Sequence, residues 1–238
     1  METRKTRKGE HTRAEILETA LELFRERGYE ETTMRAIAKA AGVAVGNAYY
    51  YFRSKEHLIQ AFYARTHEEH LAACRRVLER ERGLRERLVG VMRAKLDTIM
   101  PYHRFAGVLF KTATDPGSPL NPFSEESLPV RQQSTELFSE VIAGSDTRLT
   151  AELASELPHL LWTYHMGIVL YWIHDTSRGC VKSYRLMERS VRLVLRLISL
   201  FQFPLLRPFL KELLILLADL RSGPATAPAA ARTLEVRP

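Results

Sequence analysis

The sequence predicts an all-α protein of about nine to ten helices, and three observations support this class. Apolar residues recur at spacings of three and four along most of the chain, and no segment shows the alternation typical of a strand. Glycines and prolines fall between these periodic segments, for example at Gly28, Gly42 and Pro101. With 238 residues, of which 45% are apolar and 26% charged, the chain is long enough to bury a sizeable core.

The first helix is expected to begin at Thr12 and to end at Gly28. Thr12 and Glu15 have the spacing of a capping box, and Gly28 can supply the left-handed conformation that closes a helix. Residues 1–11 precede it as a basic, flexible arm. This arm is interpreted either as a solvated tail or as a flexible contact to a phosphate or a minor groove. Its cations are Arg4, Lys5, Arg7 and Lys8.

A second, short helix is expected after Thr33, with Gly42 at its end, and a third over residues 44–52. Ser54 is a good N-cap for a fourth helix. Short helices joined by glycine turns predict a helix-turn-helix unit at about residues 33–52, within an N-terminal domain of residues 12–62.

Residues 63–220 continue with helical periodicity and are predicted to form one helical C-terminal domain. Further helices are expected at 55–82, 84–99, 102–113, 124–142, 150–174, 181–200 and 204–220. Residues 115–122, with their prolines and glycine, predict a loop, and Pro158 predicts a kink. The tail at 221–238 is predicted to be disordered because it has too little apolar surface to bury.

The formal charge of +7 points to an anionic partner, but its distribution matters more than its sum. Residues 32–55 contain four basic side chains and no Asp or Glu, so one face of the helix-turn-helix can be positive. The larger excess lies after Asp175. Two cysteines exclude a disulfide framework, and no targeting segment precedes the first helix, so a cytoplasmic location is expected.

The segment TMRAIAKAAGVAVGNAYYYFRSK, residues 33–55, carries the chemistry expected of a DNA reader. The turn at Gly42 allows a second helix to be presented to a major groove, and that helix opens with residues 44–47. Asn47 offers a donor and an acceptor, and Val45 can meet a thymine methyl. Lys55, at the first turn of a helix, suits a phosphate. The predicted DNA-contacting residues are Thr33, Arg35, Ala44, Val45, Gly46, Asn47, Tyr49, Tyr50 and Lys55.

The three consecutive tyrosines cannot all be core. Neighbouring residues of a helix lie about 100° apart, so at least one of Tyr49, Tyr50 and Tyr51 must point outward. Ala48 and Phe52 are expected in the core. The alternative interpretation, in which the tyrosines are core residues, can hold for at most two of them, and Lys55 can still be a solvated charge.

With these motifs in register, residues 12–62 resemble the N-terminal domain of the TetR/AcrR family of bacterial transcriptional regulators. The resemblance implies an all-α homodimer, a C-terminal small-molecule pocket, and release from operator DNA when a ligand binds. It also implies phosphate contacts at Thr33 and Lys55. Two positions depart from the family pattern: Ala44 stands where a serine is common, and Tyr51 where a histidine is common. Because residues 44–46 lack hydrogen-bonding side chains, Asn47, Arg35 and DNA shape are expected to supply much of the specificity.

The C-terminal domain is expected to hold both the ligand pocket and the dimer contact. The pocket is predicted between helices of residues 84–175, although each candidate is also an ordinary core residue. Its candidates are Met92, Phe105, Leu109, Phe138, Trp162, His165 and Met166. Following the family pattern, the segments at 158–174 and 181–200 would pair with their symmetry mates.

The helix at 181–200 also carries a basic stripe, expected to lie opposite its leucines. The stripe consists of Lys182, Arg185, Arg189, Arg192 and Arg196. It is interpreted first as a solvated face beside the dimer contact, with an anionic ligand or a lipid surface as the alternatives.

Other chemistries find little support in the sequence. His67, His70 and Cys74 could share one face of a helix, but a metal site is disfavoured because an exposed histidine pair on a charged helix is common. No cofactor motif, phosphate loop or catalytic constellation is found, so an enzyme is not expected. We therefore predict a ligand-responsive homodimeric repressor of palindromic operator DNA. The alternative is a helical small-molecule binding protein with a degenerate DNA reader.

Overall fold

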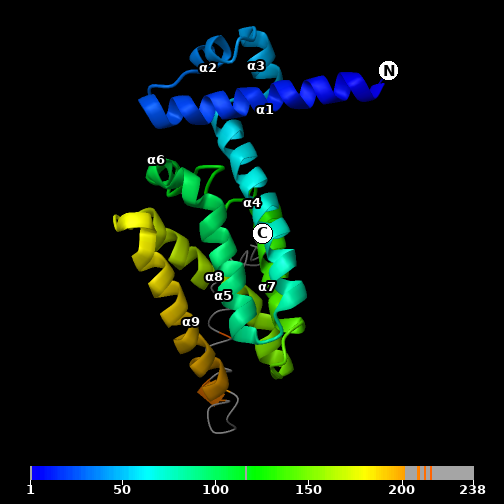
Figure 1. Cartoon of the computed structure of the whole chain (residues 1–238), viewed down its shortest axis with the longest axis vertical. Helices are drawn as coiled ribbons and strands as arrows, with labels where there is room; N and C mark the ends of the chain where they lie inside the picture. Colours follow the sequence, from blue (N-terminus) through cyan, green and yellow to red (C-terminus); the bar gives the residue numbers. More distant parts are fainter. Residues whose placement is uncertain (1, 116, 202–207, 210–211, 213–214, 216–238) are drawn as a thin grey trace, which may run out of the picture. The chain divides into compact units, whose positions relative to one another are not determined.

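The computed structural model describes residues 2–115, 117–201, 208–209, 212 and 215 (Figure 1). In this part the chain is all-helical, as predicted. The α-helices are α1 (Glu2–Arg27), α2 (Met34–Ala40), α3 (Val45–Tyr51), α4 (Lys55–Arg80), α5 (Leu84–Ile99), α6 (His103–Ala113), α7 (Leu128–Ala143), α8 (Ala151–Ile173) and α9 (Val181–Phe201). Two 3₁₀ turns are η1 (Met100–Tyr102) and η2 (Arg178–Cys180).

The chain divides into two compact units, Met1–Leu193 and Val194–Pro238, and the site described below lies in the first. The predicted helix at 204–220 lies almost entirely outside the described residues, and the predicted tail at 221–238 lies entirely outside them. None of the described helices is both long and apolar enough to cross a lipid bilayer.

The predicted start of the first helix at Thr12 is wrong, because α1 begins at Glu2. The Thr12 hydroxyl donates to the carbonyl of Lys8 at 3.0 Å, one turn back inside the helix, instead of capping a free N–H. Lysine, arginine and glutamate favour helix, and His11 and Glu15 form an exposed pair one turn apart. The predicted arm is therefore continuous with the helix.

Helices α1 to α3 enclose an apolar core, which is joined by the start of α4. Ile16, Phe24, Ile37, Phe52 and Leu58 are all essentially inaccessible to solvent in this core. Ala48 is also buried, so the expectation that Ala48 and Phe52 are core residues is confirmed. This packing holds α2 and α3 against α1 and leaves their other faces to solvent.

Helices α4, α5, α7 and α8 form a bundle, in which α4 packs mainly along α5 and α7 along α8 (Figure 1). Helix α8 runs through Pro158 without ending there. The buried Arg87 of α5 ties the bundle together. Its guanidinium donates to the carbonyls of Leu78, Glu81, Glu140 and Val141 at 2.8–2.9 Å, so it joins the end of α4 to the end of α7.

Asp175 fixes the turn between α8 and α9. Its carboxylate accepts from the N–H and hydroxyl groups of both Ser177 and Ser183, at 2.6–2.9 Å. Burial alone would raise the pKa of Asp175, but these four hydrogen bonds outweigh burial and hold the pKa well below its usual value.

Helix α9 corrects one detail of the predicted stripe. Met187 and Val191 are buried, whereas Leu186 and Leu193 are exposed. At 100° per residue, the exposed leucines lie beside the basic stripe and not opposite it. Helix α9 thus presents an inward face, an exposed leucine face and a basic face in succession.

Candidate functional site

The turn between α2 and α3 is built as a helix-turn-helix. Thr33 caps α2, since its hydroxyl accepts from the backbone N–H of Ala36 at 3.1 Å. Gly42 has φ +66°, in the left-handed region that glycine tolerates best. The chain then enters α3 with Ala44 at the N-cap, where no side-chain hydrogen bond is made.

The first turn of α3 is open to solvent along its outer side. Ala44, Val45, Gly46 and Asn47 are all exposed, whereas Ala48 is fully buried. A Cβ built at Gly46 would meet nothing within 4 Å, so this glycine faces open space. The four residues expected to face bases therefore form one continuous, accessible surface.

The tyrosine run divides as helix geometry requires. Tyr49 is 49% exposed and Tyr50 79%, whereas Tyr51 is half-buried and packs against the core. The rings of Tyr50 and Tyr51 meet edge to face at 5.1 Å between centroids. Two phenols thus point outward, as predicted, and one supports them from beneath.

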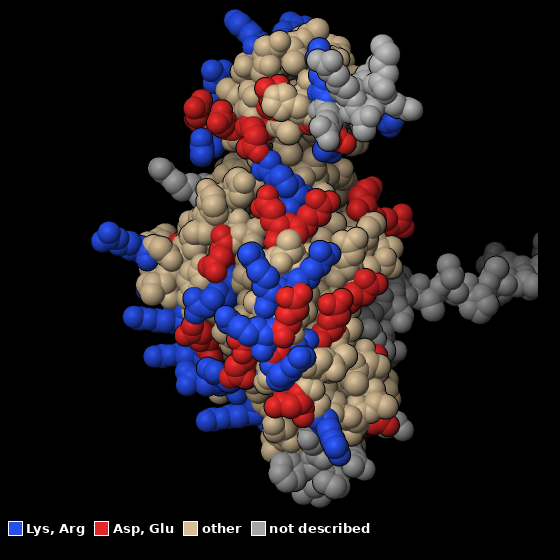
Figure 2. Space-filling view, turned by 45° about the vertical axis from the view of Figure 1, so that its right-hand side comes forward, with Lys and Arg blue, Asp and Glu red and all other residues tan. Residues whose placement is uncertain are grey.

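Basic side chains surround this surface. Arg35, Lys39 and Arg53 are all exposed, on α2 or just after α3. On the face that Figure 2 displays, Lys and Arg side chains project from the top of the molecule, and basic and acidic side chains are intermixed below. This distribution suits a polyanion approaching α3.

Lys55, the predicted phosphate contact, is engaged within the chain. Its ammonium donates to the carbonyl of Tyr29 at 2.6 Å, lies 3.4 Å from that of Glu30, and sits 4.2 Å from the centre of the Tyr29 ring. The Tyr29 hydroxyl in turn donates to Glu56 at 2.8 Å. Burial and this bond raise the pKa of Tyr29 above its usual value. In the described structure Lys55 ties α4 to the turn after α1.

The predicted pocket residues do not form one group. Phe105 and Leu109 of α6 belong to the N-terminal core, where Phe105 stacks on Phe24 of α1 at 5.9 Å between ring centroids. Phe138 contacts His165 inside the bundle, at 5.6 Å between ring centroids, and Met92 is buried on α5. The rest lie on α8, where Trp162 is buried and Met166 half-buried.

The bundle contains buried polar residues that the sequence did not reveal. His67 and His70 are 4% and 3% exposed, so the expectation of an exposed histidine pair is wrong. Burial, with a smaller contribution from the charge of Lys95, lowers the pKa of His67 to about 4 and that of His70 to about 3. Burial raises the pKa of the Cys74 thiol to about 12. No group of three or more His, Cys, Asp or Glu side chains in the described ranges is arranged to hold a metal ion.

The missed signal is an interruption in the apolar stripe of α4. After Phe62 the buried positions of α4 are Thr66, His67, His70 and Cys74. Leu71 and Leu78 of the same helix are only half-buried. Polar residues at core positions of a helix mark a functional interior more often than an error in periodicity.

Family models match both the N-terminal and the C-terminal part of the chain. A family model described as "Bacterial regulatory proteins, tetR family" matches residues 16–62. A second, described as "Tetracyclin repressor-like, C-terminal domain", matches residues 87–214, more than half of the chain. The chain belongs to the TetR family. It is therefore a DNA-binding transcriptional regulator of a non-enzymatic family, which confirms the resemblance drawn from residues 12–62.

Relatives of this TetR-family protein match only part of its length. The transcriptional regulator UidR of Escherichia coli K12 is 41% identical over 68 residues, covering 29% of this chain and 35% of UidR. The transcriptional repressor KstR2 of Mycobacterium tuberculosis H37Rv is 34% identical over 91 residues, covering 38% and 46%. The chain thus spans less than half the length of the curated relatives it matches.

Solved TetR-family structures share the fold. A regulator from Nitrosomonas europaea superposes with a TM-score of 0.58 at 18% identity, covering 76% of this chain and 96% of that one. FadR from Bacillus subtilis, in complex with stearoyl-CoA, gives a TM-score of 0.59 at 17% identity, covering 75% and 96%. At these identities the likeness establishes the fold alone.

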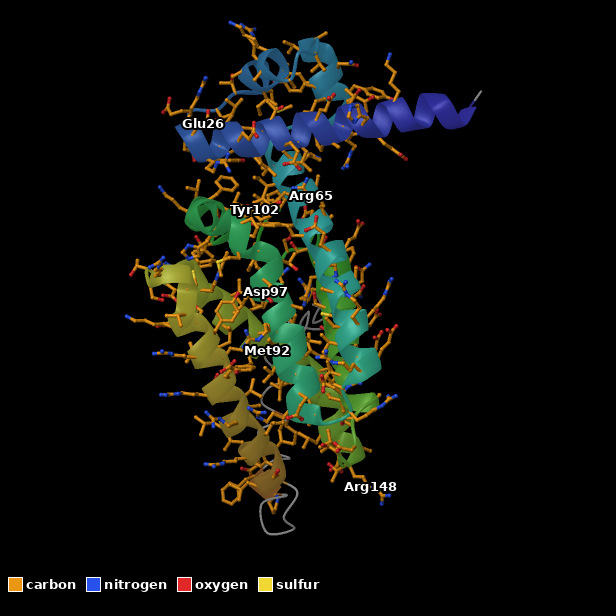
Figure 3. The ribbon with its side chains drawn as sticks, viewed as in Figure 1. Glu26, Arg65, Met92, Asp97, Tyr102 and Arg148 are labelled. Atoms are coloured by element: carbon orange, nitrogen blue, oxygen red, sulfur yellow. The ribbon has the colours of Figure 1, made fainter. Side chains whose placement is uncertain are left out.

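The DNA-reading domain of the TetR-family chain is packed directly against its bundle (Figure 3). Arg65 of α4 pairs with Glu18 of α1 and lies 3.3 Å from the hydroxyl of Tyr102. The ring of Tyr102 meets that of Phe62 edge to face at 4.7 Å between centroids. Together with the Phe24 and Phe105 stack, these contacts join α1 to α4, η1 and α6 without a flexible linker.

Proposed function

We propose that this TetR-family protein is a homodimeric repressor that binds palindromic operator DNA through α3 and releases it when a small molecule binds the bundle. The accessible surface of residues 44–47, flanked by Tyr49 and Tyr50, is the observation that carries the proposal. Such a surface fits a major groove, with Asn47 reading a base edge and the phenols donating to phosphates. This function places the protein in the cytoplasm.

Two copies are needed for a palindrome, and exposed apolar side chains support self-association. Leu186 and Leu193 of α9 are exposed by 37% and 59%, and Leu170 and Tyr171 of α8 by 42% each. Apolar faces of this kind favour an extensive subunit contact. In a Leu193→Glu variant, light scattering should detect monomers. Leu128→Glu, at an exposed leucine of α7, is the matched control and should remain dimeric.

The packed junction supports a mechanism for release. A dimer reads two half-sites about 34 to 36 Å apart, so a small change in the distance between its α3 helices lowers affinity. Because α1 contacts α6 and α4 directly, a shift of α4 or α6 on ligand binding would move the reader with it.

A gel shift with the DNA upstream of the protein's own gene tests the proposal. Wild-type protein should bind with a steep salt dependence, and binding should fall in Asn47→Ala and Tyr50→Phe. Gln132→Ala, which removes an exposed amide on α7, should bind like wild type. Specific binding that survives both α3 substitutions would overturn the assignment of the reader. Absence of any specific genomic site would favour the small-molecule binding protein instead.

A further inference from the structure

The interior of the bundle holds a polar group that DNA binding does not use. We define the histidine–lysine cluster as His67 and His70 of α4, Lys95 of α5 and His165 of α8. All three histidines are at least 95% buried. Met92, labelled in Figure 3, lies one helical turn before Lys95 and marks the level of the cluster on α5.

Ring contacts bring the three histidines together from α4 and α8. The ring centroids of His70 and His165 lie 6.0 Å apart, and those of His67 and His70 lie 6.4 Å apart. His70 donates from Nε2 to the carbonyl of Val91 at 3.0 Å, which fixes its tautomer. The Nε2 atoms of His67 and His165 are buried without a hydrogen-bond partner in the described structure. Two ring nitrogens are thus left with unused hydrogen-bonding capacity.

The charge of the cluster is not balanced. Burial lowers the pKa of Lys95 to about 8, so its amine is still mostly protonated near neutral pH. The pKa values of all three histidines are lowered, first by burial and further by the charge of Lys95, so the imidazoles are neutral. No carboxylate of the described residues forms an ion pair with Lys95. One cation therefore sits among neutral rings.

Lys95 is half-buried, and fully buried apolar side chains lie next to the cluster. Met92 and Leu96 of α5 and Phe138 of α7 are fully buried, and the Phe138 ring contacts His165. An unpaired charge in such surroundings lowers stability, and an ionisable group with a perturbed pKa marks a candidate functional site. Gln133 of α7, within hydrogen-bonding reach of His67, is exposed, so His67 lies one residue beneath the surface.

We infer that the histidine–lysine cluster binds the acid group of the effector, which is an amphiphilic organic anion with one carboxylate or phosphate and an apolar body. Lys95 supplies the charge, and His67 and His165 can each donate an N–H to an acid oxygen. The apolar body lies against Met92, Leu96 and Phe138. The inference rests on the proposed function, because it names the chemical class of the ligand that releases DNA.

Isothermal titration calorimetry of the full chain with octanoate, octyl phosphate and octan-1-ol tests this inference. At least one anion should bind, with the alcohol at least about 10-fold weaker, because only an anion pairs with Lys95. Lys95→Met should weaken binding of the anion by about 10- to 100-fold and leave the alcohol unaffected. Lys111→Met, at an exposed lysine of α6, is the matched control and should bind like wild type.

Lys95→Met should fold, because it replaces an unpaired cation by an apolar side chain of similar length, and its melting temperature should be equal to or above that of wild type. NMR signals of the His165 ring should shift when the anion binds, whereas those of exposed His11 should not. Failure of both anions to bind, equal binding of the alcohol, or unchanged affinity in Lys95→Met would overturn the inference.

A gel shift in the presence of octanoate separates this inference from the proposed function. If an anion binds through Lys95 but does not release DNA, the site stands and ligand-controlled repression fails. If DNA is bound and is released by an uncharged compound, while neither anion binds, repression stands and the anion site fails.

Discussion

The DNA reader and the helical bundle place their polar residues in opposite ways. In the reader, α1 to α3 enclose an apolar core and turn Asn47, Tyr49 and Tyr50 outward. In the bundle, the three histidines of the histidine–lysine cluster and Arg87 are buried. The difference indicates that the reader acts through its surface and the bundle through its interior. Polar substitutions should therefore change DNA binding in one region and stability or ligand binding in the other.

The largest effect is expected from Arg87→Met. The substitution leaves four carbonyls, from the ends of α4 and α7, without their donor. Loss of a buried charged donor costs about 3 to 5 kcal/mol in the free energy of unfolding. Urea denaturation of the full chain measures this value, with exposed Arg85→Met as a control that should change it by less than about 0.5 kcal/mol. An equal change in the free energy of unfolding for the two variants would contradict the stabilising role assigned to the buried Arg87.

The free energy of unfolding should also decrease as the pH is lowered, because of the buried histidines. Burial lowers the folded-state pKa of His67 to about 4 and of His70 to about 3, from an unfolded value of about 6.5. The unfolded chain therefore takes up protons first, and the stabilising contribution is complete above about pH 6.5 and lost as the pH falls toward 4 and then 3. The expected loss is on the order of a few kcal/mol.

Denaturation midpoints measured from pH 7 to pH 4 check this slope. The double variant His67→Gln, His70→Gln should flatten it, whereas His11→Gln, at an exposed histidine of α1, should not. A slope that persists in the double variant would assign the acid sensitivity to other groups.

In the reader, Asn47→Ala should affect DNA and not the fold. An exposed amide that reads a base edge contributes about 1 to 3 kcal/mol to discrimination between bases. We expect half-site variants to be distinguished about 10-fold less well, with an unfolding free energy within about 0.5 kcal/mol of wild type. Competition gel shifts on half-site variants measure the first quantity, and unchanged discrimination would remove Asn47 from the readout.

The smallest effect is expected from Thr33→Ala, where the two roles meet. Its hydroxyl caps α2 by accepting from the N–H of Ala36, so its loss costs about 1 kcal/mol of stability. Thr33→Ser keeps the cap, so its stability and its DNA affinity should both match those of wild type. If Thr33→Ser restores stability but not affinity, the methyl group of Thr33 also matters at the DNA surface.

The reader could be predicted almost completely from the sequence because its signals are local. The cap at Thr33, the turn at Gly42 and the outward tyrosines each follow from residues within a few positions of one another. The start of α1 could not be placed, because a capping box and a continuing helix share the same residue types. The hydrogen bonds of Lys55 could not be predicted either, because its ammonium donates to carbonyls 25 and 26 residues away in the sequence.

The interior of the bundle could not be predicted, because its contacts join residues that are far apart in the sequence. His70 and His165 come together only through the packing of α4 with α8, and periodicity does not distinguish a buried histidine from an exposed one. Phe105 and Leu109 likewise have ordinary core character, and only the fold assigns them to the N-terminal core instead of the pocket.

The stack of Phe105 on Phe24 limits how far this protein can serve as an assembly of exchangeable modules. Residues 12–62 do not enclose their core alone, since Phe105, Leu109 and Leu120 of the following domain complete it. A chimeric biosensor that joins this reader to the sensing domain of another regulator must therefore carry the α6 segment along or rebuild its contacts. A cut made at residue 62 would expose Phe24 and leave the grafted reader insoluble or unresponsive.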